Sequence, residues 1–118
     1  SRDLSDTLAT KLSDATEALR NWSDAASLTR LEFGEDITER VNALVDQIRS
    51  VSQPLANARK DATDAIGNRV DELSDSLTLL TGSSSNRELA LNISGRITEL
   101  TELIDETVMV STRGGTKK

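Results

Sequence analysis

The chain has 118 residues, of which 36% are hydrophobic, 29% charged and 2% aromatic, and its formal net charge is −6. This length suits one domain, and the acidic charge disfavours nucleic acid, whose binding begins with phosphate neutralisation by clustered Lys and Arg. Because cysteine and histidine are both missing from the sequence, we predict no metal site, no cofactor and no catalytic site, and therefore no enzyme.

The apolar side chains are mostly Leu, Ala, Ile and Val, which fill the seam between packed helices better than the centre of a sphere. A first helix is predicted over about 3–32. Its apolar positions recur every three or four residues and form one stripe; they are Leu4, Leu8, Leu12, Ala15, Leu19, Trp22 and Ala26.

Gly34 is predicted to end this helix, because glycine is the common residue just beyond a helix C-terminus. A second helix is predicted over about 35–52, with Asp36 and Glu39 in the two positions of a capping box. Its stripe consists of Ile37, Val41, Leu44, Ile48 and Val51.

Pro54 leaves two architectures open. Proline is tolerated in the first turn of a helix, which favours a corner followed by a third helix over about 55–81. Yet the apolar stripe keeps its phase across Pro54, which favours one kinked rod over about 35–81. The stripe beyond Pro54 consists of Leu55, Ala58, Ala62, Ala65, Ile66, Val70, Leu73, Leu77 and Leu80.

A loop is predicted at 82–86, followed by a helix over about 86–110 with Ser85 and Glu88 as its capping box. Residues 112–118 contain no apolar side chain and are predicted to be a flexible polar tail beyond a single domain of residues 1–111. The stripe of the last helix consists of Leu89, Ile93, Ile97, Leu100, Ile104 and Val108.

The alanines of the 56–66 stretch form the weakest part of the predicted core. Ala58, Ala62 and Ala65 allow helices to approach closely but bury little area, and burial contributes only about 25 cal/mol per Å². We therefore expect a kink, a partner helix or a second copy to be accommodated here.

Acidic residues three or four positions apart offer a weak alternative, a Ca²⁺ or Mg²⁺ patch. The two groups are Asp61 with Asp64, and Asp71 with Glu72 and Asp75. Neighbouring basic residues favour an ordinary solvated face instead. Trp22 could anchor a partner, but it lies in phase with the first stripe, which favours core packing.

Two resemblances follow from these features. A Trp on the first of several long helices, Trp22, resembles spectrin-type repeats, although no second Trp follows. The Ala-, Ser-, Thr- and Asp-rich, aromatic-poor sequence resembles the extracytoplasmic four-helix bundles of bacterial chemoreceptors and sensor kinases, and equally coiled-coil segments of secretion and filament proteins. These are resemblances of composition, and no family is assigned from them.

The sequence thus predicts an all-α protein, an elongated antiparallel bundle of three to four long amphipathic helices with coiled-coil-like heptad packing. We expect a non-catalytic interaction or assembly module whose partners are other protein helices and which self-associates as a homo-oligomer. The residues expected to carry the interaction are Leu44, Ile48, Val51, Leu55, Leu73, Leu77, Leu80, Ile93, Ile97 and Leu100.

Two other functions stay open. One is an extracytoplasmic ligand-sensing four-helix bundle excised from a membrane receptor or sensor kinase. The other is an amphipathic protein of lipid surfaces whose bundle opens. Since no apolar run approaches the roughly 18 residues that span a bilayer, no membrane insertion is expected, and no signal peptide is visible. The compartment is left unassigned.

Overall fold

A computed structural model describes residues 2–24, 28–82 and 87–116, and their side chains over 4–21, 34–82 and 87–113. These residues form five helices and no strand, so the predicted all-α bundle is confirmed. The molecule is elongated, with extents of 56 × 23 × 18 Å. The helices are α1 (Arg2–Asp24), α2 (Leu28–Ser50), α3 (Ser52–Ala56), α4 (Lys60–Thr81) and α5 (Arg87–Thr116).

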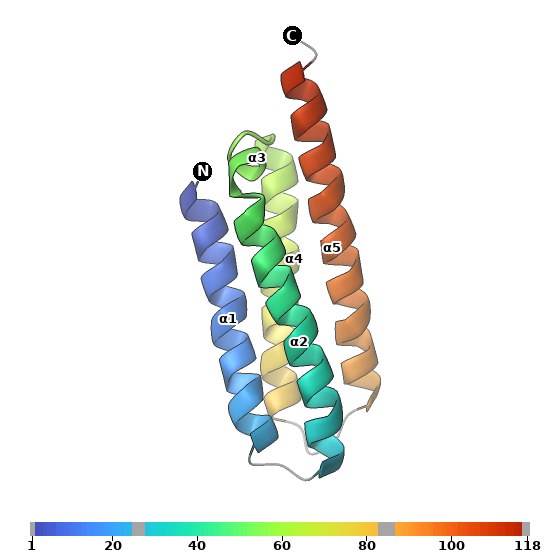
Figure 1. The fold of residues 1–118 in the computed structure, drawn as a ribbon. Helices are drawn as coiled ribbons and strands as arrows, with labels where there is room; N and C mark the ends of the chain where they lie inside the picture. Colours follow the sequence, from blue (N-terminus) through green and yellow to red (C-terminus); the bar gives the residue numbers. More distant parts are fainter. Residues whose placement is uncertain (1, 25–27, 83–86, 117–118) are drawn as a thin grey trace.

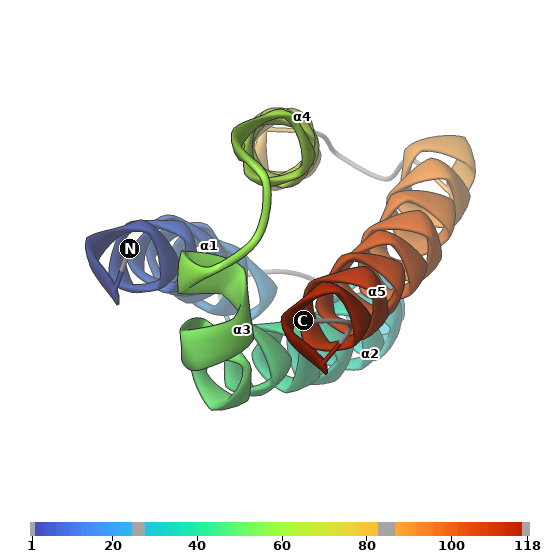
Figure 2. The ribbon, with the colours of Figure 1, turned by 90° about the horizontal axis from the view of Figure 1, so that it is seen from above.

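The four long helices form two antiparallel hairpins, α1–α2 and α4–α5 (Figure 1). Seen from above, α1 lies beside α2 and α4, and α5 lies beside α4 and α2 (Figure 2). The hairpins therefore pack with α1 parallel to α4 and with α2 parallel to α5. The short helix α3 lies over the end of α1 and α2, and the segment 57–59 after it crosses to α4 and so joins the two hairpins (Figure 2).

The core is one continuous cluster that runs the length of the bundle. It confirms the predicted stripes over most of their length, because side chains that recur every three or four residues on each helix all turn to the same centre. The largest fully buried side chains are Leu12, Leu19, Ile37, Leu44, Ile48, Leu55, Ile66, Leu73, Leu77, Leu80, Ile93 and Leu100.

The predicted helix break at Gly34 is wrong. The first helix ends at Asp24 instead of near residue 32, and α2 begins at Leu28 and runs through Gly34. Gly34 is buried, and its carbonyl accepts a hydrogen bond from Thr38 Oγ1 at 2.8 Å. A glycine inside a helix costs only about 1 kcal/mol relative to alanine, which burial of the α2 stripe offsets. Asp36 and Glu39 therefore lie inside α2 and cap nothing.

Pro54 lies at a corner, which excludes the single rod over 35–81. It is the third residue of α3, where its missing N–H breaks no helical hydrogen bond. Arg59, just before α4, has extended backbone angles of φ −66° and ψ 146°, so the chain turns between Ala56 and Lys60. The corner splits the helix predicted over 55–81 into α3 and α4.

The C-terminal prediction is also wrong in part. The helix expected to end near residue 110 continues to Thr116, so most of the predicted tail, residues 112–118, is helical. Polar composition excludes burial but not helix formation, because extending an existing helix needs no new nucleus. The predicted capping residue Ser85 lies outside the described residues, as does the end of the tail at residues 117 and 118.

Ser5 is the weak point inside the core. Its hydroxyl oxygen is buried with no hydrogen-bond partner in the described part of the chain. Because an unsatisfied buried polar group costs roughly 1–3 kcal/mol, we expect Ser5→Ala to raise the free energy of unfolding by about 1 kcal/mol. Urea denaturation followed by circular dichroism measures this difference. Ser74→Ala, at a half-buried position of α4, is the control, and an equal gain there would contradict the assignment to Ser5.

Candidate functional site

The ten residues predicted to carry an interaction all face the interior. All but Val51 are buried, and half-buried Val51 packs against the same core. They form the centre of the bundle on α2, α3, α4 and α5, where they contact one another rather than solvent. A partner cannot reach them while the bundle is closed, so a binding surface has to be sought elsewhere.

The seam between α4 and α5 changes character along its length. In its lower half two ion pairs join the helices: Arg96 Nη1 lies 3.2 Å from Glu72 Oε1, and Arg69 Nη1 lies 3.0 Å from Glu99 Oε1. These two pairs define one antiparallel register. Continued towards α3, this register places Ala62 opposite Glu106. The Ala62 side chain is too short to reach Glu106, so no ion pair of the described residues joins the two helices at this level.

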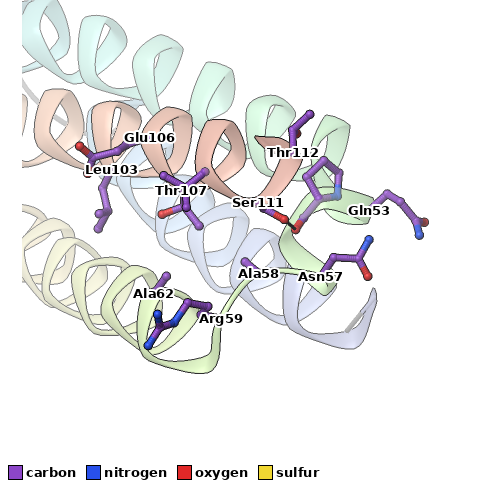
Figure 3. A pocket seen from close by; sticks show the side chains of 12 residues that line it. Gln53, Asn57, Ala58, Arg59, Ala62, Leu103, Glu106, Thr107, Ser111 and Thr112 are labelled. Carbon is purple, nitrogen blue, oxygen red and sulfur yellow. Dashed lines mark hydrogen bonds between the residues drawn. The ribbon is translucent and has the colours of Figure 1, made fainter. Parts of the chain in front are cut away.

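A groove of about 810 Å³ opens where the bridge is lost. Figure 3 shows Leu103 and Thr107 pointing from α5 towards α4, with Ala62 across the opening and Glu106 at the rim. A smaller hollow of about 310 Å³ shares Leu103 and Glu106 with this groove and extends it down the seam to Arg69 and Glu99. The groove is lined by Gln53, Pro54, Asn57, Ala58, Arg59, Ala62, Leu103, Glu106, Thr107, Val110, Ser111 and Thr112.

Most of the groove surface is apolar. Val110 is 56% exposed although it is a large aliphatic side chain, while Leu103, Ala58 and Ala62 are half-buried. At the end of the bundle, Ser111 Oγ donates a hydrogen bond of 3.0 Å to the carbonyl oxygen of Pro54 and ties α5 to α3. Apolar atoms on both walls of the groove therefore face solvent.

Charges of both signs surround the groove. On the α4 side, Arg59 Nε lies 3.3 Å from Asp61 Oδ1. Next to it, Asp64 accepts a 2.9 Å hydrogen bond from Lys60, which raises the pKa of Lys60 above its ordinary value of 10.5. On the α5 side, Glu102 and Glu106 are exposed.

The acidic groups considered as a metal patch are dispersed among basic partners. Asp64 pairs with Lys60 and Asp71 with Lys11, while Glu72 pairs with Arg96. Within the described ranges, no three acidic side chains gather where they could hold a metal ion. The arrangement is that of a solvated face. Trp22 lies near the end of α1, and its side chain falls outside the described part of the chain.

Sequence reasoning found one wall of the groove and missed the other. Two alanines of the 56–66 stretch, Ala58 and Ala62, form the wall opposite α5, and small side chains at stripe positions indicate thin packing. Leu103 and Val110 on α5 were missed, because they lie beside the stripe of Ile97, Leu100 and Ile104 rather than on it. Their signal is their spacing, since Leu103 and Val110 lie seven residues apart and therefore share one face of α5 beside the stripe.

No helix within the described ranges is both long and apolar enough to cross a bilayer. Comparison with known proteins finds no matching family model, no matching curated protein and no matching solved structure. The function therefore has to be inferred from the chemistry of the groove and of the buried core.

Proposed function

We propose that this chain is a non-catalytic interaction module that binds a helix of a partner protein in the groove between α4 and α5. The observation that carries the proposal is the apolar groove at the alanine-lined end, where Val110 faces solvent across from Ala58 and Ala62. A helix with large apolar side chains would fill the space that these alanines leave, as helix-in-groove recognition requires.

The shape of the groove favours a helix over a compact ligand. From Glu99 to Thr112, α5 spans 14 residues, so the groove and its extension run for roughly 20 Å at about 1.5 Å per residue step. Small-molecule pockets enclose most of their ligand and converge on a few polar groups. Here the opening runs along the surface, and the described charged residues around it are all exposed. An amphipathic helix of three to four turns matches these dimensions.

Ala62→Leu is the substitution that tests the groove. The leucine side chain is expected to occupy the groove and to lower the affinity for a helix at least about tenfold, with little effect on folding because it projects into open space. The probe is a designed helical peptide of about 18 residues with a leucine stripe flanked by glutamine. Titration calorimetry measures its binding to the original chain and to the variant.

Ala18→Leu, at an exposed position of α1, is the matched control and should bind the peptide as the original chain does. Sedimentation equilibrium of the chain alone tests self-association over a wide concentration range. A dimer that Ala62→Leu dissociates would make a second copy the occupant of the groove. A strict monomer of 12.8 kDa that binds no helical peptide would refute the proposal.

A sensing bundle of a membrane receptor or sensor kinase is the second candidate. One observation favours it: α1 begins and α5 ends at the same end of the bundle (Figure 1). Helices that continue into a membrane would both leave from that end. The discriminating observation is the parent reading frame, which should encode an apolar span of about 18 residues or more on each flank. Flanks without such spans would exclude this candidate.

A further inference from the structure

The α5 wall of the groove carries two carboxylates that the rest of the bundle does not neutralise. Glu102 and Glu106 are both exposed, and neither forms an ion pair or a side-chain hydrogen bond with any other residue that the structure describes. They lie four residues apart and therefore project from the same face of α5. Both line the hollow that extends the groove.

The other charges at the groove already have partners. Arg69 lies 3.0 Å from Glu99, and Arg59 lies 3.3 Å from Asp61. Each of these pairs has no net charge, so the negative charges of Glu102 and Glu106 remain unbalanced at the groove. Like charges at this spacing repel each other within a helix. A cation placed between them would relieve the repulsion and complete the pattern of ion pairs that the lower half of the seam already shows.

From these charges we propose that the groove selects an amphipathic helix with Lys or Arg beside its apolar stripe, contributed by a different protein. This inference rests on the proposed function and adds the chemistry of the partner. The apolar stripe of that helix lies against Ala58, Ala62 and Val110, and its basic residues, one turn apart, reach Glu102 and Glu106. A second copy of this chain is the poorer occupant, since two chains of net charge −6 repel each other.

The test compares two peptides that share one leucine stripe. In one the stripe is flanked by lysine and in the other by glutamine, and each is titrated into the complete chain at low and at physiological salt. We expect the lysine peptide to bind roughly tenfold more tightly at low salt, and the advantage to shrink as salt screens the pairs. Equal affinities for the two peptides would overturn the charge inference and leave helix binding itself intact.

A double variant, Glu102→Gln with Glu106→Gln, locates the effect. It should remove most of the lysine peptide's advantage without lowering the melting temperature, because it deletes a repulsion and no pair. The matched control is Asp75→Gln with Glu88→Gln, which removes two exposed carboxylates on α4 and α5 outside the groove lining and should keep the advantage. If both double variants lose it equally, the attraction belongs to the net charge of the chain and the proposal fails.

Discussion

Replacing Ile48 with aspartate is expected to unfold the protein at room temperature. Ile48 is fully buried at the centre of the core, and an unpaired carboxylate there costs more than most single substitutions, above about 4 kcal/mol. Domains of this size have a total stability of about 5–15 kcal/mol, so little or none would remain. Loss of the helical circular dichroism signal and of the cooperative melting transition measures the effect.

The pH dependence of this variant carries a definite sign. Burial raises the pKa of the introduced carboxyl group in the folded state above its value in the unfolded chain. The folded state then binds more protons between these two values, and stability is recovered as the pH falls. Ala43→Asp, at an exposed position of the same helix, should melt nearly as the original chain does. An unchanged melting curve for Ile48→Asp would contradict the core described here.

Leu55→Ala is expected to cost about 2–5 kcal/mol, the usual range for a buried leucine that leaves a cavity. Leu55 lies on α3, which is only five residues long, yet its side chain is as deeply buried as those of the long helices. Since α3 packs against α1 and α5, this one side chain closes the end of the core beneath the corner. Urea denaturation measures the loss.

Leu79→Ala removes the same atoms from a side chain that is 66% exposed on α4 and should change the stability by no more than about 0.5 kcal/mol. If the two variants lost similar amounts, Leu55 would not close the core, and the corner at Pro54 would be a surface turn with no role in packing.

Hydrophobic periodicity predicted which residues are buried far better than where the helices end. The stripe of Ile93, Ile97, Leu100 and Ile104 is buried in full, because a spacing of three and four leaves a single solution for the face that turns inward. The sequence predicts a helix end at Gly34, since glycine commonly ends helices. A helix-ending glycine normally adopts positive φ, however, and no described glycine does so here.

Pro54 shows why an unbroken stripe does not imply an unbroken helix. Val51 and Leu55 before the turn and Ile66 after it keep one phase, because the residues on both sides of the corner face the same core. The polar tail shows the converse, since α5 continues beyond Val108, the last residue of its apolar stripe, and ends at Thr116. Burial and helix formation are separate properties, and the sequence pattern reports mainly the first.

The groove was only half predictable for a related reason. Small residues in a stripe indicate that packing is thin, and two of these alanines, Ala58 and Ala62, do line the groove. Which residues of α5 form the opposite wall depends on the register between α4 and α5. That register brings together residues far apart in the sequence, such as Arg69 and Glu99, thirty residues apart. A single sequence carries no direct signal for such pairs.

The single connection between the two hairpins has a consequence for how two chains could combine. In each of the hairpins α1–α2 and α4–α5 the two helices pack on each other, and residues 51–59 are the segment of chain that connects the hairpins. If that connection straightened, each hairpin could pack on the complementary hairpin of another molecule through the same buried side chains. Such an exchanged dimer would need no new interface, because it reuses the one that closes the monomer. The same apolar side chains would then form the core of the monomer and the interface of the exchanged dimer.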